Sequence, residues 1–247
     1  MLTIKQIEKN LKRIQVKEKY IIIHSDIAGL TFNNFSVKKL WKIIFNSFGK
    51  DKTYIFPTFT LNKLKKRVWS YNKSKSESGI LSEYIRKKKS SLRSIHPLHS
   101  VCIFGKNKKK IPSHNCLSSF GKGSIWEWLC NSKEVCNLSL GLNLEGGATF
   151  CHYSEEFMKV SYRKYKNFYF NIYKKNNNKI HQKFLYFGRK KNFKNNWNKC
   201  EKDLFKKSLI KKYVFPENKY SILKMNTYHS TRFLIKKIKS NKFYLVK

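Results

Sequence analysis

The run Tyr20-Ile21-Ile22-Ile23-His24-Ser25 is a short apolar stretch that ends in polar residues. Its length and its β-branched residues are typical of a strand buried on both faces. Amphipathic helical patterns flank it at residues 4–14, after a Thr3–Gln6 capping box, and at residues 37–45, after Ser36. Further apolar runs follow at residues 53–56, 101–104 and 135–140. This alternation predicts an α/β fold in which helices cover both faces of a central mixed sheet, giving three layers.

The character of the sequence changes after residue 163. The patterns there predict paired strands at 168–173 and 184–187, a helix that includes Leu204, Leu209 and Ile210, and strands at 221–225 and 244–246 around a helix at 230–240. We expect a single domain over residues 1–247, with a core of residues 1–163 that carries the site and an α+β extension of residues 164–247. The polar segment 63–78, rich in Lys and Ser, predicts a long mobile loop.

The chain is strongly basic: 54 Lys and Arg residues face 14 acidic ones, for a formal net charge of +40. A polyanionic partner such as nucleic acid would explain this charge. Compositional drift would explain it too, because Lys, Asn, Ile, Phe and Tyr are all frequent together. The basic residues run along the whole chain rather than in one patch, which favours drift. The hydrophobic content of 40% excludes a disordered polycation.

Targeting and cysteine patterns predict a cytoplasmic protein. No charged start leads into an apolar run, as in a signal peptide, and no stretch approaches the roughly 20 apolar residues of a membrane span. None of the six cysteines forms a CxxC pair, and no Cys/His cluster has zinc-finger spacing. We therefore expect reduced thiols and no bound metal.

The segment Thr149-Phe150-Cys151-His152-Tyr153-Ser154-Glu155-Glu156 carries the sharpest chemical pattern. In a helix, His152 and Glu155 share one face, three residues apart. A carboxylate beside an imidazole fixes its tautomer and raises its basicity, so the pattern predicts a general base with its orienting acid. An ordinary exposed His–Glu helix pair fits the same spacing. A zinc site is less favoured because no HExxH pattern accompanies the pair.

Two further segments are candidates for binding. In Phe120-Gly121-Lys122-Gly123-Ser124, two glycines precede a predicted helix, where free N–H groups favour phosphate; a simple turn is the alternative. In Arg93-Ser94-Ile95-His96-Pro97-Leu98-His99-Ser100, polar residues crowd around one proline. Buried polar groups must be paired, so this knot is either a hydrogen-bonded structural bracket or the wall of a site.

In this order, the motifs resemble the aminoglycoside 3-N-acetyltransferase family along nearly the whole chain. The resemblance rests on His24-Ser25, Phe56-Pro57-Thr58-Phe59-Thr60, the 93–100 run, the 120–124 turn, Leu140-Gly141, Thr149 to Glu155, and Val160-Ser161-Tyr162-Arg163. The C-terminal part matches only in texture. Ser161 departs from the proline that is frequent in the family, and the basic loop 63–78 departs where acceptor specificity is expected.

The resemblance implies acetyl-CoA as the donor, an amino group on a sugar as the acceptor, and a fold unlike that of the GNAT acetyltransferases. It gives His152 the role of base and Glu155 that of orienter, while Thr149 or the backbone of residues 121–124 would stabilise the oxyanion. The residues implied to surround the CoA arm and pyrophosphate are His24, Ser25, Arg93, Ser94, His99, Ser100, Phe120, Gly121, Lys122, Gly123 and Ser124. A homodimer is one expectation for its assembly.

The net charge of the chain does not by itself decide between the candidate acceptors. A protein at +40 repels polycationic aminoglycosides and attracts anions, which favours a nucleotide-linked aminosugar. Screening by salt beyond about 8–10 Å weakens this argument. The alternative function is a non-enzymatic protein that binds nucleic acid through the interleaved Lys and aromatic residues of 164–175. A third reading is an inactive family member kept for scaffolding, and the presence of both His152 and Glu155 argues against it.

Overall fold

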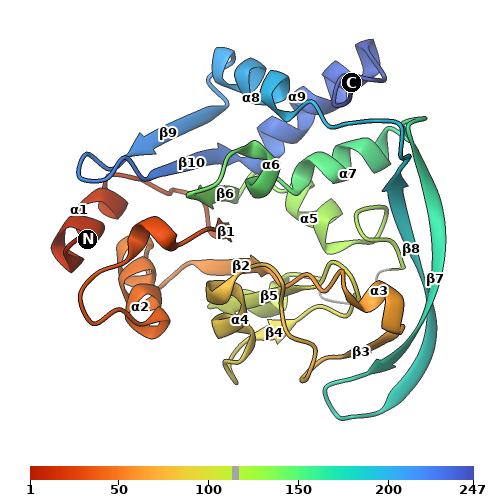
Figure 1. Ribbon diagram of the computed structural model, residues 1–247, viewed down its shortest axis with the longest axis horizontal. Helices are drawn as coiled ribbons and strands as arrows, with labels where there is room; N and C mark the ends of the chain where they lie inside the picture. Colours follow the sequence, from red (N-terminus) through yellow and green to blue (C-terminus); the bar gives the residue numbers. More distant parts are fainter. Residues whose placement is uncertain (113–116) are drawn as a thin grey trace.

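The main sheet of the protein is seen in a computed structural model that describes residues 1–112 and 117–247 (Figure 1). Its order is β4-β5-β2-β1-β6-β10-β9. The strands are β1 (Tyr20–Ser25), β2 (Thr53–Pro57), β4 (Leu92–Arg93), β5 (Val101–Gly105), β6 (Val135–Leu140), β9 (Ile210–Val214) and β10 (Ser221–Asn226). Strand β1 runs parallel to β2 and β6, and the outer pairs are antiparallel. The expected mixed sheet is confirmed.

Alternate residues of β1 face two separate hydrophobic cores. Ile21 and Ile23 pack in one core, to which α1 (Ile4–Lys12), α2 (Val37–Phe48) and α4 (Ile80–Arg86) contribute. Tyr20 and Ile22 pack in the other, with residues of α5 (Ile125–Asn131), α6 (Leu144–Gly147), α7 (Phe150–Phe157), α8 (Trp197–Lys206) and α9 (Thr227–Ser240). Burial on both faces explains the continuous apolar run of β1 and confirms the three layers.

The predicted helix starts are present. Thr3 and Gln6 form a capping box at α1, and the Ser36 hydroxyl accepts from the Lys39 N–H at the start of α2. Each cap satisfies backbone N–H groups that the first helical turn leaves unpaired. The local sequence thus fixes where these helices begin.

The segment after residue 163 supplies both a second sheet and part of the first. Strands β7 (Arg163–Tyr173) and β8 (Lys179–Arg189) form the predicted hairpin, longer than expected, along one side of the molecule (Figure 1). Strands β9 and β10 join the main sheet beside β6. The chain therefore builds one edge of its central sheet from C-terminal residues.

Two expectations in this segment were wrong. Helix α8 ends at Lys206, and Ile210 begins β9, because Ser208 adopts a left-handed conformation with φ 54° and turns the chain. Residues 244–246 form no regular strand. Tyr244 donates its N–H to Asn241 in a turn, and Val246 makes only an isolated bridge to Asn195.

The long loop expected at residues 63–78 also needs correction. It contains a short helix, α3 (Lys63–Lys66), and a strand, β3 (Val68–Ser70), which pairs with β7. Trp69 is fully buried in a small core with Phe170, Ile172 and Phe184. A single tryptophan between polar residues gives little periodicity, but its burial anchors the segment against the hairpin.

Candidate active site

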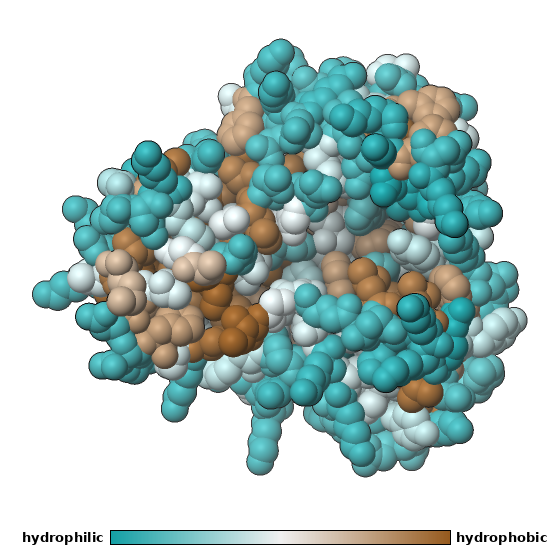
Figure 2. Space-filling model, viewed as in Figure 1, coloured by the Kyte–Doolittle hydropathy of each residue, from teal (hydrophilic) through white to brown (hydrophobic). Residues whose placement is uncertain are grey.

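A cleft of about 560 Å³ opens at the carboxyl ends of β1, β2 and β6. Open α/β sheets place ligands at this edge because side chains after parallel strands converge there. Figure 2 shows a hollow near the centre of the face in view, with both hydrophobic and hydrophilic residues around it. The lining residues are His24, Ser25, Pro57, Phe59, Leu61, Glu77, Ser78, Gly79, His99, Phe120, Leu142, Glu145, Gly146, Ala148, Thr149, His152, Tyr186 and Trp197.

His152 and Glu155 lie on one face of α7, as their spacing predicts. The His152 Nδ1 and Glu155 Oε2 atoms are 2.8 Å apart. The Glu155 side chain is 1% exposed, whereas that of His152 is 32% exposed and lines the cleft. An ionised carboxylate only accepts hydrogen bonds, so Nδ1 carries the proton and donates it. The neutral imidazole is then left with Nε2 as its basic atom.

Tyr162 and Arg163, which are adjacent in sequence, make the other two contacts of the Glu155 carboxylate. Arg163 Nη2 lies 2.7 Å from Oε2, and the Tyr162 hydroxyl donates to Oε1 at 3.0 Å. Burial raises the pKa of the Glu155 carboxyl, but the hydrogen bond from His152 and the positive charge of Arg163 outweigh it and bring that pKa below its ordinary value. Glu155 is therefore a carboxylate held in place at three contacts.

Aromatic and neutral polar groups form the rest of the wall. The Phe120 and Trp197 rings lie 5.3 Å and 5.8 Å from the His152 ring, between centroids. Burial lowers the pKa of His24 to about 3 and that of His99 well below its ordinary value, so both are uncharged. Thr149 Oγ1 lies 3.5 Å from His24 Nε2.

Among the described residues, two acidic side chains line the cleft. Glu77 and Glu145 line it, and neither Lys nor Arg is among the lining residues. The Glu77 N–H donates to the Phe59 carbonyl, and its carboxylate accepts from the Asn62 N–H, so the residue is fixed beside β2. Glu145 lies in the first turn of α6, just after β6. Two carboxylates therefore line the cleft of a chain whose formal net charge is +40.

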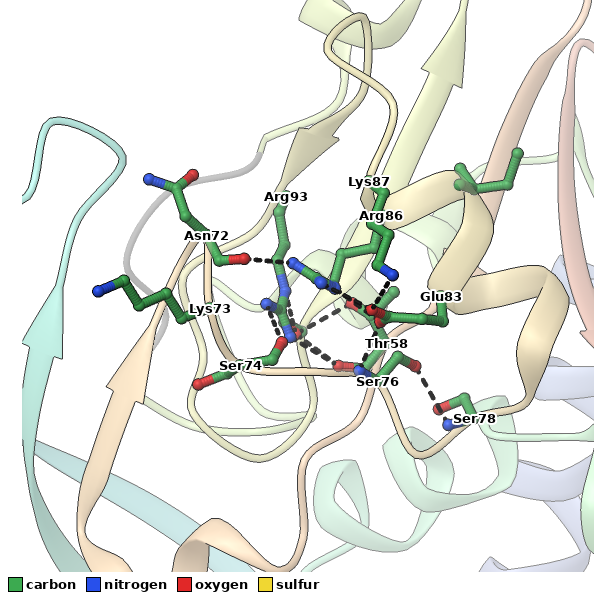
Figure 3. Close-up of polar contacts among 12 residues, drawn as sticks. Thr58, Asn72, Lys73, Ser74, Ser76, Ser78, Glu83, Arg86, Lys87 and Arg93 are labelled. Atoms are coloured by element: carbon green, nitrogen blue, oxygen red, sulfur yellow. Dashed lines mark hydrogen bonds and ion pairs between the residues drawn. The ribbon is translucent and has the colours of Figure 1, made fainter.

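The knot at residues 93–100 is mostly a structural bracket. Arg93 is 4% exposed, and its guanidinium donates to the carbonyls of Thr58, Tyr71 and Ser74 and to the Ser100 hydroxyl. Figure 3 shows Arg93 beside Thr58 and Ser74. Ser94 accepts from the Val101 N–H. These contacts, with the neighbouring Glu83–Arg86 pair, hold the segment that carries Glu77 to the cleft. Within the predicted group of Arg93, Ser94, His99 and Ser100, only His99 lines the cleft.

The glycine turn also uses its polar groups internally. Phe120 lines the cleft, but Gly123 and Ser124 face a separate hollow, and Lys122 is exposed. The Gly123 N–H donates to the Glu127 carboxylate at 2.6 Å, and Ser124 caps α5. A Cβ on Gly121 would collide with the Glu156 carboxylate. A carboxylate at a helix start disfavours phosphate there, so these contacts argue against the phosphate cradle predicted for this turn.

The structure therefore brings together six of the predicted site residues in the cleft: His24, Ser25, His99, Phe120, Thr149 and His152. Glu155 lies directly behind His152. Sequence reasoning missed Glu77, Glu145, Tyr186 and Trp197. The position of Glu145, just after the predicted strand 135–140, was a usable signal because sites gather at strand ends. Tyr186 and Trp197 come from the distant C-terminal segment and carry no local pattern.

Within residues 1–112 and 117–247, no three His, Cys, Asp or Glu side chains cluster as ligands for a metal ion. In the same ranges, no helix has both the length and the apolar composition to cross a bilayer. Cys102, Cys130, Cys136, Cys151 and Cys200 are buried and unpaired in disulfides, and Cys116 lies outside the described residues.

Comparisons with known proteins agree with this fold. The fold is similar to that of the YokD protein from Bacillus subtilis, with 16% identity, a TM-score of 0.81, and coverage of 97% of this chain and 94% of that one. It is similar to aminoglycoside acetyltransferase AAC(3)-Xa, with 13% identity, a TM-score of 0.82, and coverage of 97% and 93%. AAC-IIIb, solved as a binary complex with CoASH, gives 13% identity, a TM-score of 0.81, and coverage of 97% of each chain.

A search of curated proteins found no match. The family model described as Aminoglycoside 3-N-acetyltransferase matches residues 22–230, which is most of the chain. The chain therefore belongs to the aminoglycoside 3-N-acetyltransferase family of acyltransferases, as its ordered motifs predicted.

Proposed function

We propose that the protein transfers an acetyl group from acetyl-CoA to an amino group of a cationic aminosugar, with His152 as general base. The observation that carries the proposal is the cleft itself. The His152 Nδ1–H donates to the buried Glu155 carboxylate, and Nε2 is kept for a substrate in a cleft that two carboxylates line. The relative AAC-IIIb was solved with CoASH, and AAC-VIa with sisomicin, which supports both substrate classes.

The proton path follows from the donors. An aminosugar amine is mostly protonated at neutral pH, so it must lose a proton before or during attack. His152 Nε2 accepts that proton, and Glu155 stabilises the imidazolium that results. The amine nitrogen bonds to the thioester carbonyl carbon, and the carbon–sulfur bond then breaks with loss of CoA thiolate. Thr149, which lines the cleft, is our candidate donor for the oxyanion.

A covalent route through Cys151 is disfavoured. The residue is fully buried, and burial raises the pKa of its thiol well above the ordinary value. Adjacent residues on a helix also point in different directions, so Cys151 does not share the face of His152. Direct attack by the amine needs no acyl-enzyme.

The uncharged part of the cleft fits the arm of the donor. Ser25 Oγ is buried, lines the cleft, and has no hydrogen-bond partner within the described residues. Such a hydroxyl is costly unless a ligand pairs with it. We expect His24, Ser25, His99 and Phe120 to contact the amide-bearing arm of CoA. Within the 120–124 turn, we expect only Lys122 to attract an anionic group of the donor.

The rim carboxylates favour a cationic acceptor over a nucleotide-linked aminosugar. Glu77 and Glu145 lie within contact range of any ligand in the cleft, whereas the many lysines elsewhere are screened beyond about 8–10 Å. Beside these two carboxylates, short-range charge therefore favours a cationic amine as the acceptor over an anionic one. This reverses the acceptor preference drawn from the net charge alone.

The test is a turnover screen with acetyl-CoA that measures release of free thiol. A polycationic aminoglycoside such as sisomicin is compared with a nucleotide-linked aminosugar, and binding of labelled single-stranded RNA is measured in parallel. We expect turnover with the aminoglycoside at least about tenfold faster than with the nucleotide sugar. Turnover with neither acceptor, together with tight salt-dependent RNA binding, would overturn the enzymatic proposal in favour of a polyanion-binding protein.

A further inference from the structure

Arg163 begins β7 and reaches the back of the catalytic pair. The residue is 9% exposed, and its Nη2 lies 2.7 Å from Glu155 Oε2. Its Nη1 donates to the carbonyl of Phe187 on β8 at 3.1 Å. Its Nε is buried and has no hydrogen-bond partner among the residues described. The Arg163 side chain therefore contacts both the Glu155 carboxylate and strand β8, whose Tyr186 lines the cleft.

The same guanidinium lies close to the base itself. Arg163 Nη2 is 3.2 Å from His152 Nδ1. Both atoms carry hydrogen when Nδ1 donates to Glu155, so this approach is not a hydrogen bond. What remains is a positive charge beside an imidazole that must become positive during the reaction. Two opposite charges, Glu155 and Arg163, thus act on one ring from short range.

We propose that Arg163 is a positioning residue that aligns Glu155 behind His152 and sets the pH below which the base is lost. This inference rests on the proposed role of His152. Glu155 favours uptake of a proton by the pair and Arg163 opposes it, so the two charges act against each other on the imidazole. Without Arg163, uptake of a proton by the pair becomes easier, whichever of the two groups holds it.

The other titratable groups around His152 do not replace this charge. His99 and His24 are kept neutral by burial, and burial raises the pKa of the Tyr162 hydroxyl, so it too is uncharged. The uncharged rings of Phe120 and Trp197 lie next to the imidazole, tilted and edge-on respectively. Glu77 and Glu145 lie on the cleft rim, and Glu156 is turned toward Ser118. Arg163 is the basic residue in contact with the pair.

The experiment compares pH profiles of kcat/KM for the variants Arg163→Met, Arg163→Gln, Arg163→Lys and Glu155→Gln. Arg189→Met is the matched control, because Arg189 pairs with Arg163 in the β-ladder and donates to the Phe193 carbonyl instead. Loss of the charge in the Met and Gln variants should move the acidic limb up by about one pH unit. Glu155→Gln should move it down. Arg163→Lys and Arg189→Met should leave it in place.

A second readout does not depend on turnover. The imidazole of His152 is titrated by NMR in each variant, with its signal assigned from a His152→Gln spectrum, and circular dichroism checks folding. An upward midpoint in the neutral Arg163 variants, absent in Arg163→Lys, supports the inference even if no acceptor is found. Equal midpoints in wild type and the Gln variant, or an equal shift in Arg189→Met, would overturn it. Lack of turnover by the wild type with a normal titration would instead count against the proposed function alone.

Discussion

The cleft around His152 and the knot around Arg93 are both dense in polar side chains, yet they differ in one respect. At His152, ring nitrogen Nδ1 is hydrogen-bonded to Glu155, and ring nitrogen Nε2 is left for a ligand in the cleft. In the knot, Arg93 donates to three carbonyls and a hydroxyl, all within the protein. Polar density alone does not make a site. A site needs a functional atom that the fold positions but does not consume.

The largest expected effect tests the cleft around His152. Replacing His152 by Gln removes the basic nitrogen and should lower kcat by about 10²–10⁴, because a general base contributes that much. Binding of CoA, measured by calorimetry, should change little, since we expect the donor arm to contact other residues of the cleft. Turnover within a few-fold of wild type would exclude His152 as the base.

The variant Arg93→Met tests the knot around Arg93. The carbonyls of Thr58, Tyr71 and Ser74 would each lose a charged donor, and we expect a loss of about 3–5 kcal/mol in unfolding free energy. Chemical denaturation measures this loss, and kcat of the remaining folded enzyme should be near that of wild type. A stable Arg93→Met protein with strongly reduced affinity for CoA would instead make the knot a wall of the donor site.

Acid should unfold the protein through its buried histidines. Burial lowers the pKa of His24 and His96 to about 3, and that of His99 well below its ordinary value. The unfolded chain binds protons on all three below about pH 6.5, while the folded chain does not. Stability is therefore fully present above that pH and is lost as the pH falls, by about 4 kcal/mol per unit for three groups.

The measurement is the unfolding free energy between about pH 6.5 and pH 4. His96→Asn should flatten the slope by roughly one third, because it removes one of the three protons. His96 Nδ1 accepts from the N–H groups of Leu98 and His99, and the Asn amide oxygen can partly replace it. A slope that does not change in this variant would show that His96 is not neutral in the fold.

The smallest expected effect concerns the rim. Glu145→Gln and Glu77→Gln should each raise KM for a polycationic aminoglycoside by about two- to fivefold, since exposed charge pairs contribute about 0.2–1 kcal/mol. The effect should shrink as salt rises. Glu8→Gln, on α1, is the control and should leave KM unchanged. An equal rise in the control would mean that net charge, and not the cleft rim, governs the acceptor.

How far the sequence predicted the fold depended on the range of the signals. The strands at 20–25 and 135–140, the capped helix starts, and the β7–β8 hairpin all follow from residues close in the chain. The errors lie where a distant contact decided. Trp69 made a strand of an expected loop by packing on β7, and Ser208 ended a helix whose apolar residues continued. Local propensity yields to such tertiary contacts.

By itself, the sequence determined the three-layer architecture, the family, and the pairing of His152 with Glu155, because each is set by local periodicity or by the order of motifs. Only the tertiary structure decided which polar groups remain available. It paired the Arg93 guanidinium with acceptors inside the protein and paired the Gly123 N–H with the Glu127 carboxylate. It also brought Glu77 and Glu145 to a cleft in a chain of net charge +40. Hydrogen-bond satisfaction and short-range charge depend on distances between remote residues, and a linear pattern does not contain those distances.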